Sequence, residues 1–124
     1  MNMQKYVYIL ILLAVIIAGG IWWKRAPPAL PNPLDSFAKC LAEKAVTMYG
    51  ADWCPHCQKE KKAFGSAFKY VPYVECPDNP KKCLDLGVEG YPTWILKDGR
   101  KLVGEQGLEK LAQESGCPLP SSIE

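Results

Sequence analysis

Hydrophobic and polar positions divide the chain into two unlike parts. Residues 6–23 form one unbroken apolar run, whereas residues from 34 onward alternate short apolar stretches with polar and charged ones. The run holds eighteen residues without a charge. As a helix, a run of this length crosses the hydrocarbon core of a bilayer. The sequence therefore predicts an N-terminal transmembrane helix followed by a domain that folds in water.

Both ends of the apolar run carry interfacial residues. They are Lys5, Tyr6 and Tyr8 at the start, and Trp22, Trp23, Lys24 and Arg25 at the end. A cleaved signal peptide is the alternative, because the small residues at 18–20 resemble a cleavage site. The run is longer than the 7–15 apolar residues usual in signal peptides, which favours an anchor. The flanking charges nearly balance and do not set the orientation, but either interpretation exports the domain.

The remaining pattern predicts an α/β fold. Four helices are expected at 35–44, 55–70, 79–86 and 108–115, and four strands at 45–49, 71–76, 93–97 and 101–105. A helix connects the first two strands, whereas Asp98 and Gly99 form a tight turn between the last two. This order predicts a mixed central sheet of about four strands flanked by helices.

The same pattern sets the predicted domain boundaries. Residues 1–25 are the membrane anchor or an uncleaved signal, and residues 34–118 are the folded domain. Between them, four prolines make residues 26–33 a stiff, extended spacer. Residues 119–124 are a C-terminal tail.

Composition argues against nucleic acid as a partner. The chain has 15 Lys and Arg against 13 Asp and Glu, a formal net charge of +2. Three of the basic residues flank the apolar run, and the others are interleaved with acidic residues. No basic stripe is left to neutralise a phosphate backbone.

The most informative motif is Cys54-Pro55-His56-Cys57, which follows a predicted strand and begins a predicted helix. The positive end of the helix dipole and free backbone N–H groups stabilise a thiolate at this place. Cys54 is therefore expected to be the nucleophile, and Cys57, one turn further on, the resolving thiol. His56, Pro55 and Trp53 are expected to tune the reactivity of the sulfur.

Zinc binding and a purely structural bridge are the other interpretations of two cysteines at this spacing. His56 is the only histidine and no second pair at this spacing exists, whereas structural zinc takes four ligands. The strand-to-helix position argues against a structural bridge. We therefore expect no metal and no cofactor, only a redox-active disulfide.

These motifs resemble the thioredoxin superfamily, on Trp53-Cys54-Pro55-His56-Cys57 together with Gly90-Tyr91-Pro92-Thr93. The Pro-His dipeptide is similar to that of the bacterial DsbA oxidases. Four further stretches more closely resemble the thioredoxin-like domain fused to bacterial and plant vitamin K epoxide reductase homologues: residues 37–41, 48–51, 68–71 and 91–94. The resemblance covers about residues 34–117, and not the quinone-reducing membrane bundle of those fusions.

The resemblance implies a cis peptide bond before Pro92, packed beside the active disulfide. Tyr91, Pro92 and Thr93 would then bind an extended substrate, and Tyr91 would also tune the sulfur environment. A proline at the start of a strand is the alternative interpretation, and cis X-Pro bonds are uncommon in general.

One position departs from the family pattern. Typical thioredoxins carry a buried carboxylate six residues before the first active cysteine, where it serves proton transfer to the resolving thiol. This chain has Met48 at that position. Resolution must then use water or another base, and Glu75 and Asp52 are the candidates.

The other four cysteines are expected to form structural disulfides. Cys76 and Cys83 bracket a turn-rich loop that brings them together, and their pairing also resembles a structural disulfide of the family domain. Cys40 and Cys117 are then left as a pair by elimination, although four cysteines allow three connectivities. An even cysteine count fits an oxidising compartment such as the periplasm, the cell exterior or the thylakoid lumen.

The sequence therefore predicts a membrane-anchored thiol–disulfide oxidoreductase that acts on exported proteins. We expect an oxidase that is reoxidised by a quinone-linked membrane partner, one similar to vitamin K epoxide reductase. Two alternatives stay open. The first is an exported reductase of the cytochrome-maturation type, and the second is a non-catalytic peptide-binding module.

Overall fold

The computed structural model describes residues 2–23 and 30–121, which belong to two compact units, Met1–Leu30 and Pro31–Glu124. In the first unit, helix α1 (Met3–Trp23) has a mean hydropathy of 2.0 over Met3–Ile21. It is long and apolar enough to cross a membrane, but a signal sequence has the same properties. Lys24, Arg25, residues 26–29 of the predicted spacer and residues 122–124 of the tail lie outside the described residues.

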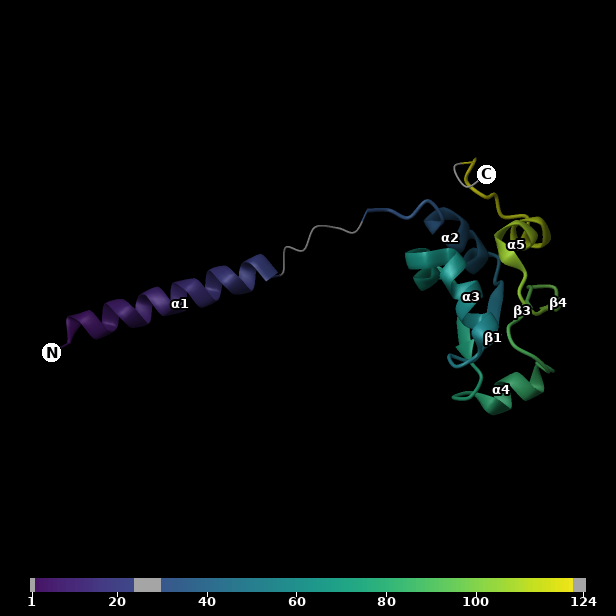
Figure 1. Ribbon diagram of the computed structural model, residues 1–124, viewed down its shortest axis with the longest axis horizontal. Helices are drawn as coiled ribbons and strands as arrows, with labels where there is room; N and C mark the ends of the chain where they lie inside the picture. The colour runs from purple at the N-terminus through teal and green to yellow at the C-terminus, as the bar shows by residue number, and fades with distance from the viewer. Residues whose placement is uncertain (1, 24–29, 122–124) are drawn as a thin grey trace. The chain divides into compact units, whose positions relative to one another are not determined.

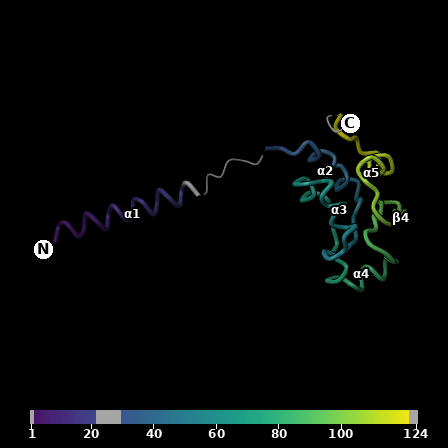
Figure 2. Tube along the Cα trace, viewed as in Figure 1, coloured from purple at the N-terminus to yellow at the C-terminus, as the bar shows by residue number. Residues whose placement is uncertain are grey.

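The second unit contains the predicted helices and strands (Figure 1). In chain order they are α2 (Asp35–Glu43), β1 (Thr47–Gly50), α3 (Pro55–Phe64), the 3-10 helix η1 (Gly65–Tyr70), β2 (Tyr73–Glu75), α4 (Pro80–Asp85), β3 (Thr93–Ile95), β4 (Lys101–Val103) and α5 (Gly107–Ser115). Within this unit, α4 lies at the end away from α2 and α5 (Figures 1 and 2, drawn in the same view).

The four strands form one mixed sheet in the order β2-β1-β3-β4. Strand β1 pairs parallel with β2 and antiparallel with β3, and β3 pairs antiparallel with β4. The predicted mixed sheet of four strands is confirmed. In the β1–β2 register, Met48 lies opposite Tyr73 and Gly50 opposite Glu75, which places the end of β2 beside the residues that lead into α3.

Aromatic side chains join the helices to the sheet in the core. The ring of Phe64 on α3 stacks on Phe37 of α2 at 5.8 Å and lies 6.0 Å from Trp94 of β3. All three side chains are fully buried. Because burial of an aromatic side chain contributes about 1.5–3 kcal/mol, this cluster fixes α3 on the sheet. The start of α3 is thereby held at the end of β1.

Most of the predicted elements differ from the observed ones by one or two residues at an end, and two boundaries differ for a reason that the backbone shows. The expected single helix over 55–70 ends as an α-helix at Phe64, because Gly65 has φ +56° and ψ −135°, and the chain continues as η1. The side chain of Asn32 donates a hydrogen bond to the carbonyl of Phe64 at this break. The strand expected from Ala45 begins at Thr47, because Ala45 has φ +54° and cannot continue a strand.

Candidate active site

Cys54 lies at the start of α3. It has an extended backbone (φ −77°, ψ 119°), and Pro55, which needs no partner for a backbone N–H, is the first helical residue. The backbone N–H of Gln58 donates to the carbonyl of Cys54 and closes the first turn. The Cys54 sulfur therefore lies at the positive end of the helix, where backbone N–H groups favour negative charge.

Cys57 lies one turn further on and is fully buried. Both cysteines are free thiols. Burial raises the pKa of Cys57 well above its usual range and the neighbouring Cys54 raises it further, whereas a backbone hydrogen bond from Ala51 and the charge of Lys61 oppose the shift. Cys57 therefore keeps its proton until the reaction removes it, as the predicted resolving thiol must.

The loop before β3 closes over Cys54. The Tyr91–Pro92 peptide bond is cis, and the carbonyl oxygen of Tyr91 lies 3.7 Å from the Cys54 sulfur. Pro92 is buried, and its carbonyl accepts a hydrogen bond from the N–H of Gly104. Thr93 is buried as well, and its hydroxyl donates to the carbonyl of Gly90 within the loop. Thr93 thus braces the loop, while the backbone of Tyr91 faces the active sulfur.

Apolar surface surrounds this loop. Trp53 is 68% exposed, and its ring meets the Tyr91 ring edge-on at 6.1 Å between centroids. Val103 on β4 is 65% exposed and lies near Gly90, since a Cβ on Gly90 would come within 3.6 Å of it. Exposed apolar side chains beside a reactive sulfur suit the backbone and apolar side chains of an extended peptide.

His56 contacts the loop between β4 and α5. Its Nδ1 pairs with the carboxylate of Glu105, which also pairs with Lys59 at 2.6 Å. These two neighbours lower the pKa of Glu105. Sequence reasoning did not find Glu105, because it lies 49 residues from His56 and only the fold brings them together.

Glu60 is a buried carboxylate on α3 that sequence reasoning also missed. It accepts hydrogen bonds from the backbone N–H groups of Gln106 and Gly107 and thereby caps the start of α5. Burial raises the pKa of Glu60, and the two hydrogen bonds oppose the shift. Cys57, Glu60 and Phe64 are spaced so that all three lie on the buried face of α3. This spacing was the sequence signal that could have indicated a buried carboxylate at Glu60.

The remaining cysteines form two disulfides. Cys40 is bonded to Cys117, with a Cα–Cα distance of 5.9 Å, and Cys76 to Cys83, with 5.8 Å. These are the two pairs expected from the sequence. Neither disulfide includes a cysteine of the α3 motif, so the free thiols and the bridges are separate pairs.

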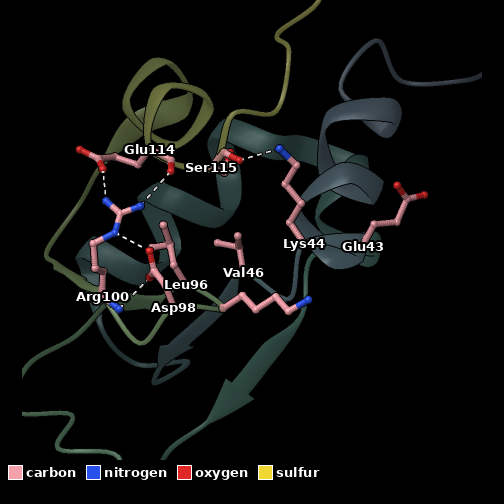
Figure 3. Close-up of a pocket in the computed structure, with 9 residues that line it drawn as sticks. Glu43, Lys44, Val46, Leu96, Asp98, Arg100, Glu114 and Ser115 are labelled. Atoms are coloured by element: carbon pink, nitrogen blue, oxygen red, sulfur yellow. Dashed lines mark hydrogen bonds and ion pairs between the residues drawn. The ribbon is translucent and has the colours of Figure 1, made fainter.

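A charged hollow of about 410 Å³ lies between α2, α5 and the β3–β4 turn (Figure 3). Four of its charged groups are paired within the protein. Arg100 pairs with Asp98 and Glu114, and Lys44 donates to the carbonyls of Ser115 and Gly116. Because these contacts fasten the end of α5 to α2, we interpret the hollow as structural.

Within residues 2–23 and 30–121, no three His, Cys, Asp or Glu side chains come together so as to hold a metal ion.

Comparison with known proteins agrees with this geometry. The pattern of the Thioredoxin family matches residues 32–114. The chain belongs to the thioredoxin family. This match covers the whole described sheet and the helices of the second unit except the last residue of α5, and it places the cysteine motif of α3 within the family domain.

Curated relatives of this thioredoxin-family chain include named disulfide enzymes. The chain is 43% identical to the thiol-disulfide oxidoreductase LTO1 of Arabidopsis thaliana over 72% of its own length and 26% of that protein's. It is 29% identical to protein disulfide isomerase-like 2-2 of Oryza sativa subsp. japonica, over 90% and 38%. It is 33% identical to the thioredoxin domain-containing protein 5 homologue of Drosophila melanogaster, over 73% and 25%.

The chain thus spans between a quarter and two fifths of the length of these relatives. Its domain is of the thiol–disulfide oxidoreductase class.

Proposed function

We propose that this protein is a membrane-anchored thiol–disulfide oxidoreductase that oxidises exported proteins through Cys54 and Cys57. One observation carries the proposal: the Cys54 sulfur lies at the start of α3, 3.7 Å from the Tyr91 carbonyl, with the free thiol of Cys57 one turn further on. Such a pair exchanges electrons by forming and breaking its own disulfide.

Oxidation of a substrate dithiol would proceed in two exchanges. A substrate thiolate attacks Cys54 in the Cys54–Cys57 disulfide, and the electron pair of the broken bond leaves with Cys57, which takes up a proton. The second substrate thiolate then attacks the first substrate sulfur, which is bonded to Cys54 in the mixed disulfide. The substrate disulfide forms, and the Cys54 thiolate is released. The substrate loses two electrons and two protons, and the protein gains them.

The surface beside Cys54 supports a peptide substrate. The exposed ring of Trp53 and the exposed side chain of Val103 flank the Tyr91–Pro92 loop, whose backbone faces the sulfur. An extended segment with a cysteine opposite Cys54 would lie along this loop. Tyr91 and Pro92 are proposed to bind it, and Thr93 to hold the loop in place.

The compartment and the partner are proposed from the rest of the chain. Helix α1 is apolar from Tyr6 onward, as a membrane anchor requires. Four cysteines form two disulfides, and disulfides persist in oxidising compartments. We place the domain on the extracytoplasmic side of a membrane. The resemblance to domains fused to vitamin K epoxide reductase homologues suggests a quinone-linked membrane protein as the oxidant of the Cys54–Cys57 pair.

The decisive experiment is the reduction potential of the Cys54–Cys57 pair, measured in glutathione buffers with the Cys54→Ser variant as a blank. A value near about −120 mV supports oxidation of substrates, and one near about −270 mV supports the reverse reaction, an exported reductase. If the potential is near about −120 mV, the oxidised domain should also introduce disulfides into a reduced, unfolded client protein. Absence of any exchange by the intact domain would leave only a peptide-binding module and would refute the enzyme assignment.

A further inference from the structure

Cys57 needs a proton partner that its immediate surroundings do not supply. The thiol is fully buried, and its proton must leave or return whenever the disulfide forms or opens. Met48, at the position of the carboxylate of typical thioredoxins, is buried and apolar. On the adjacent strand, however, Tyr73 lies opposite Met48, and Glu75 lies two residues further along.

Gly50 leaves room for Tyr73 to approach the Cys57 sulfur. A Cβ on Gly50 would lie 2.7 Å from the sulfur of Cys57 and 3.5 Å from the hydroxyl oxygen of Tyr73. The sulfur and the hydroxyl therefore border the same small space above Gly50. A side chain at residue 50 would occupy the space that the Cys57 sulfur and the Tyr73 hydroxyl border.

The hydroxyl of Tyr73 continues to a carboxylate. It donates a hydrogen bond to Oε2 of Glu75, and Oε1 of Glu75 accepts one from the backbone N–H of Asp52 at 3.0 Å. Tyr73 and Glu75 are both half-buried. The pair thus connects the space beside the buried sulfur to a half-buried carboxylate.

Glu75 is the base that the other charged groups around Cys57 leave available. Glu60 shares the buried face of α3 with Cys57, but both of its oxygens accept hydrogen bonds from the N–H groups of Gln106 and Gly107. From α3, Lys61 lies 3.8 Å above the Tyr73 ring and pairs with Asp52 at 2.6 Å, which occupies the Asp52 carboxylate. Cys54 is the reaction partner itself. Burial and the charge of Glu75 raise the pKa of Tyr73 far above its ordinary value, so Tyr73 keeps a proton to pass on.

We propose that Glu75 is the proton acceptor and donor for Cys57, acting through the hydroxyl of Tyr73. This rests on the proposed exchange at Cys54 and Cys57 but not on its direction. In reduction of a substrate disulfide, Cys57 gives its proton to Tyr73 while Tyr73 gives its own to Glu75. The Cys57 thiolate then attacks Cys54, and the electron pair of the mixed disulfide leaves with the substrate sulfur. In oxidation of a substrate, the same protons run back to Cys57.

The test separates the first attack from resolution. The reduced domain is mixed with a fluorescent disulfide-bonded peptide, quenched in acid at intervals, and assayed for the mixed disulfide between pH 5 and 9. Glu75→Gln and Tyr73→Phe are expected to form the mixed disulfide at the normal rate and to resolve it at least about tenfold more slowly at pH 7. Their resolution rate should rise with hydroxide concentration, because water replaces the lost base.

Controls distinguish this role from a structural one. Glu43→Gln removes an exposed carboxylate before β1, whereas the active motif follows that strand, and this variant should resolve the mixed disulfide like the unchanged protein. The double variant Tyr73→Phe, Glu75→Gln should be no slower than either single variant. Unchanged resolution and pH dependence in both single variants would overturn the proton path alone. No mixed disulfide with the unchanged protein would overturn the proposed function and the path together.

Discussion

The two free thiols and three of the four bridged cysteines are buried to a similar extent, yet only the free pair is proposed to react. Cys54 and Cys57 are 5% and 0% exposed, and Cys76, Cys83 and Cys117 are 1–3% exposed. Exposure therefore does not decide which sulfurs take part in exchange. The polar groups around each sulfur differ instead.

The free pair lies among polar groups. Cys54 is at a helix start, whose N–H groups favour a thiolate, and the Cys57 sulfur and the Tyr73 hydroxyl border the same space above Gly50. Cys76 and Cys83 pack instead in a small apolar cluster with Tyr49 and Val88. Apolar surroundings of this kind disfavour a thiolate, and the two sulfurs are bonded to each other.

The largest effect on disulfide exchange is expected when one cysteine of the reactive pair is replaced. Cys54→Ser should reduce disulfide exchange with a peptide substrate to the rate of the buffer dithiol alone, because no attacking sulfur remains at the helix start. Cys57→Ser should instead accumulate a mixed disulfide on Cys54. Mass spectrometry of the acid-quenched reaction checks both. If Cys54→Ser retains exchange, another cysteine is the nucleophile and the comparison fails.

The second largest effect is expected when the Cys40–Cys117 disulfide is removed. Cys40 and Cys117 are 77 residues apart, and closing a loop of this size stabilises the fold by about 4.5 kcal/mol in the chain-entropy treatment, less any strain. The double variant Cys40→Ser, Cys117→Ser should lose about that much stability in urea unfolding. Exchange by the folded fraction should stay unchanged. A loss of exchange without a loss of stability would mean that this pair relays electrons.

A smaller effect is expected for the short disulfide. Cys76 and Cys83 are 7 residues apart, and the same treatment gives about 2.5 kcal/mol. Cys76→Ser, Cys83→Ser should therefore lower the urea midpoint less than the loss of the long disulfide does. In graded reduction of the oxidised protein followed by thiol labelling, Cys54 should be labelled before either. Earlier labelling of Cys76 would contradict the comparison.

The smallest effect concerns Glu60. Its raised pKa in the folded state means that the folded protein binds more protons than the unfolded chain just above pH 4.3. The stabilisation from this group is complete below that pH and is lost as the pH rises through the folded pKa. Glu60→Gln should remove this slope from the urea midpoint measured between pH 4 and 7. Identical slopes in both proteins would show that Glu60 does not titrate in this way.

Much of the fold could be predicted from local sequence. The apolar run gives α1, the Pro-led helix after a short strand gives α3, and the Asp98-Gly99 turn gives the β3–β4 hairpin. The break after Phe64 was missed because a single glycine is compatible with a continuing helix, and only the contacts of Asn32 reveal the change of direction.

The site was predictable where its chemistry is contiguous in sequence and not where the fold assembles it. Cys54 and Cys57 lie within one motif, so their placement followed from it. Glu105 reaches His56 across 49 residues, and Tyr73 approaches Cys57 only because β2 pairs in one particular register with β1. Side-chain pairs that depend on register are not encoded in any local pattern.

The bond between Cys40 and Cys117 also determines how the chain would respond to a pulling force. It closes residues 40–117 into a covalent ring that contains the whole sheet. A pull between the N-terminal segment and the C-terminal residues would pass through the two sulfurs and leave the enclosed strands unstretched. The same ring would hold both fragments together after a single proteolytic cut inside it, so such a cut would show on a gel only after reduction.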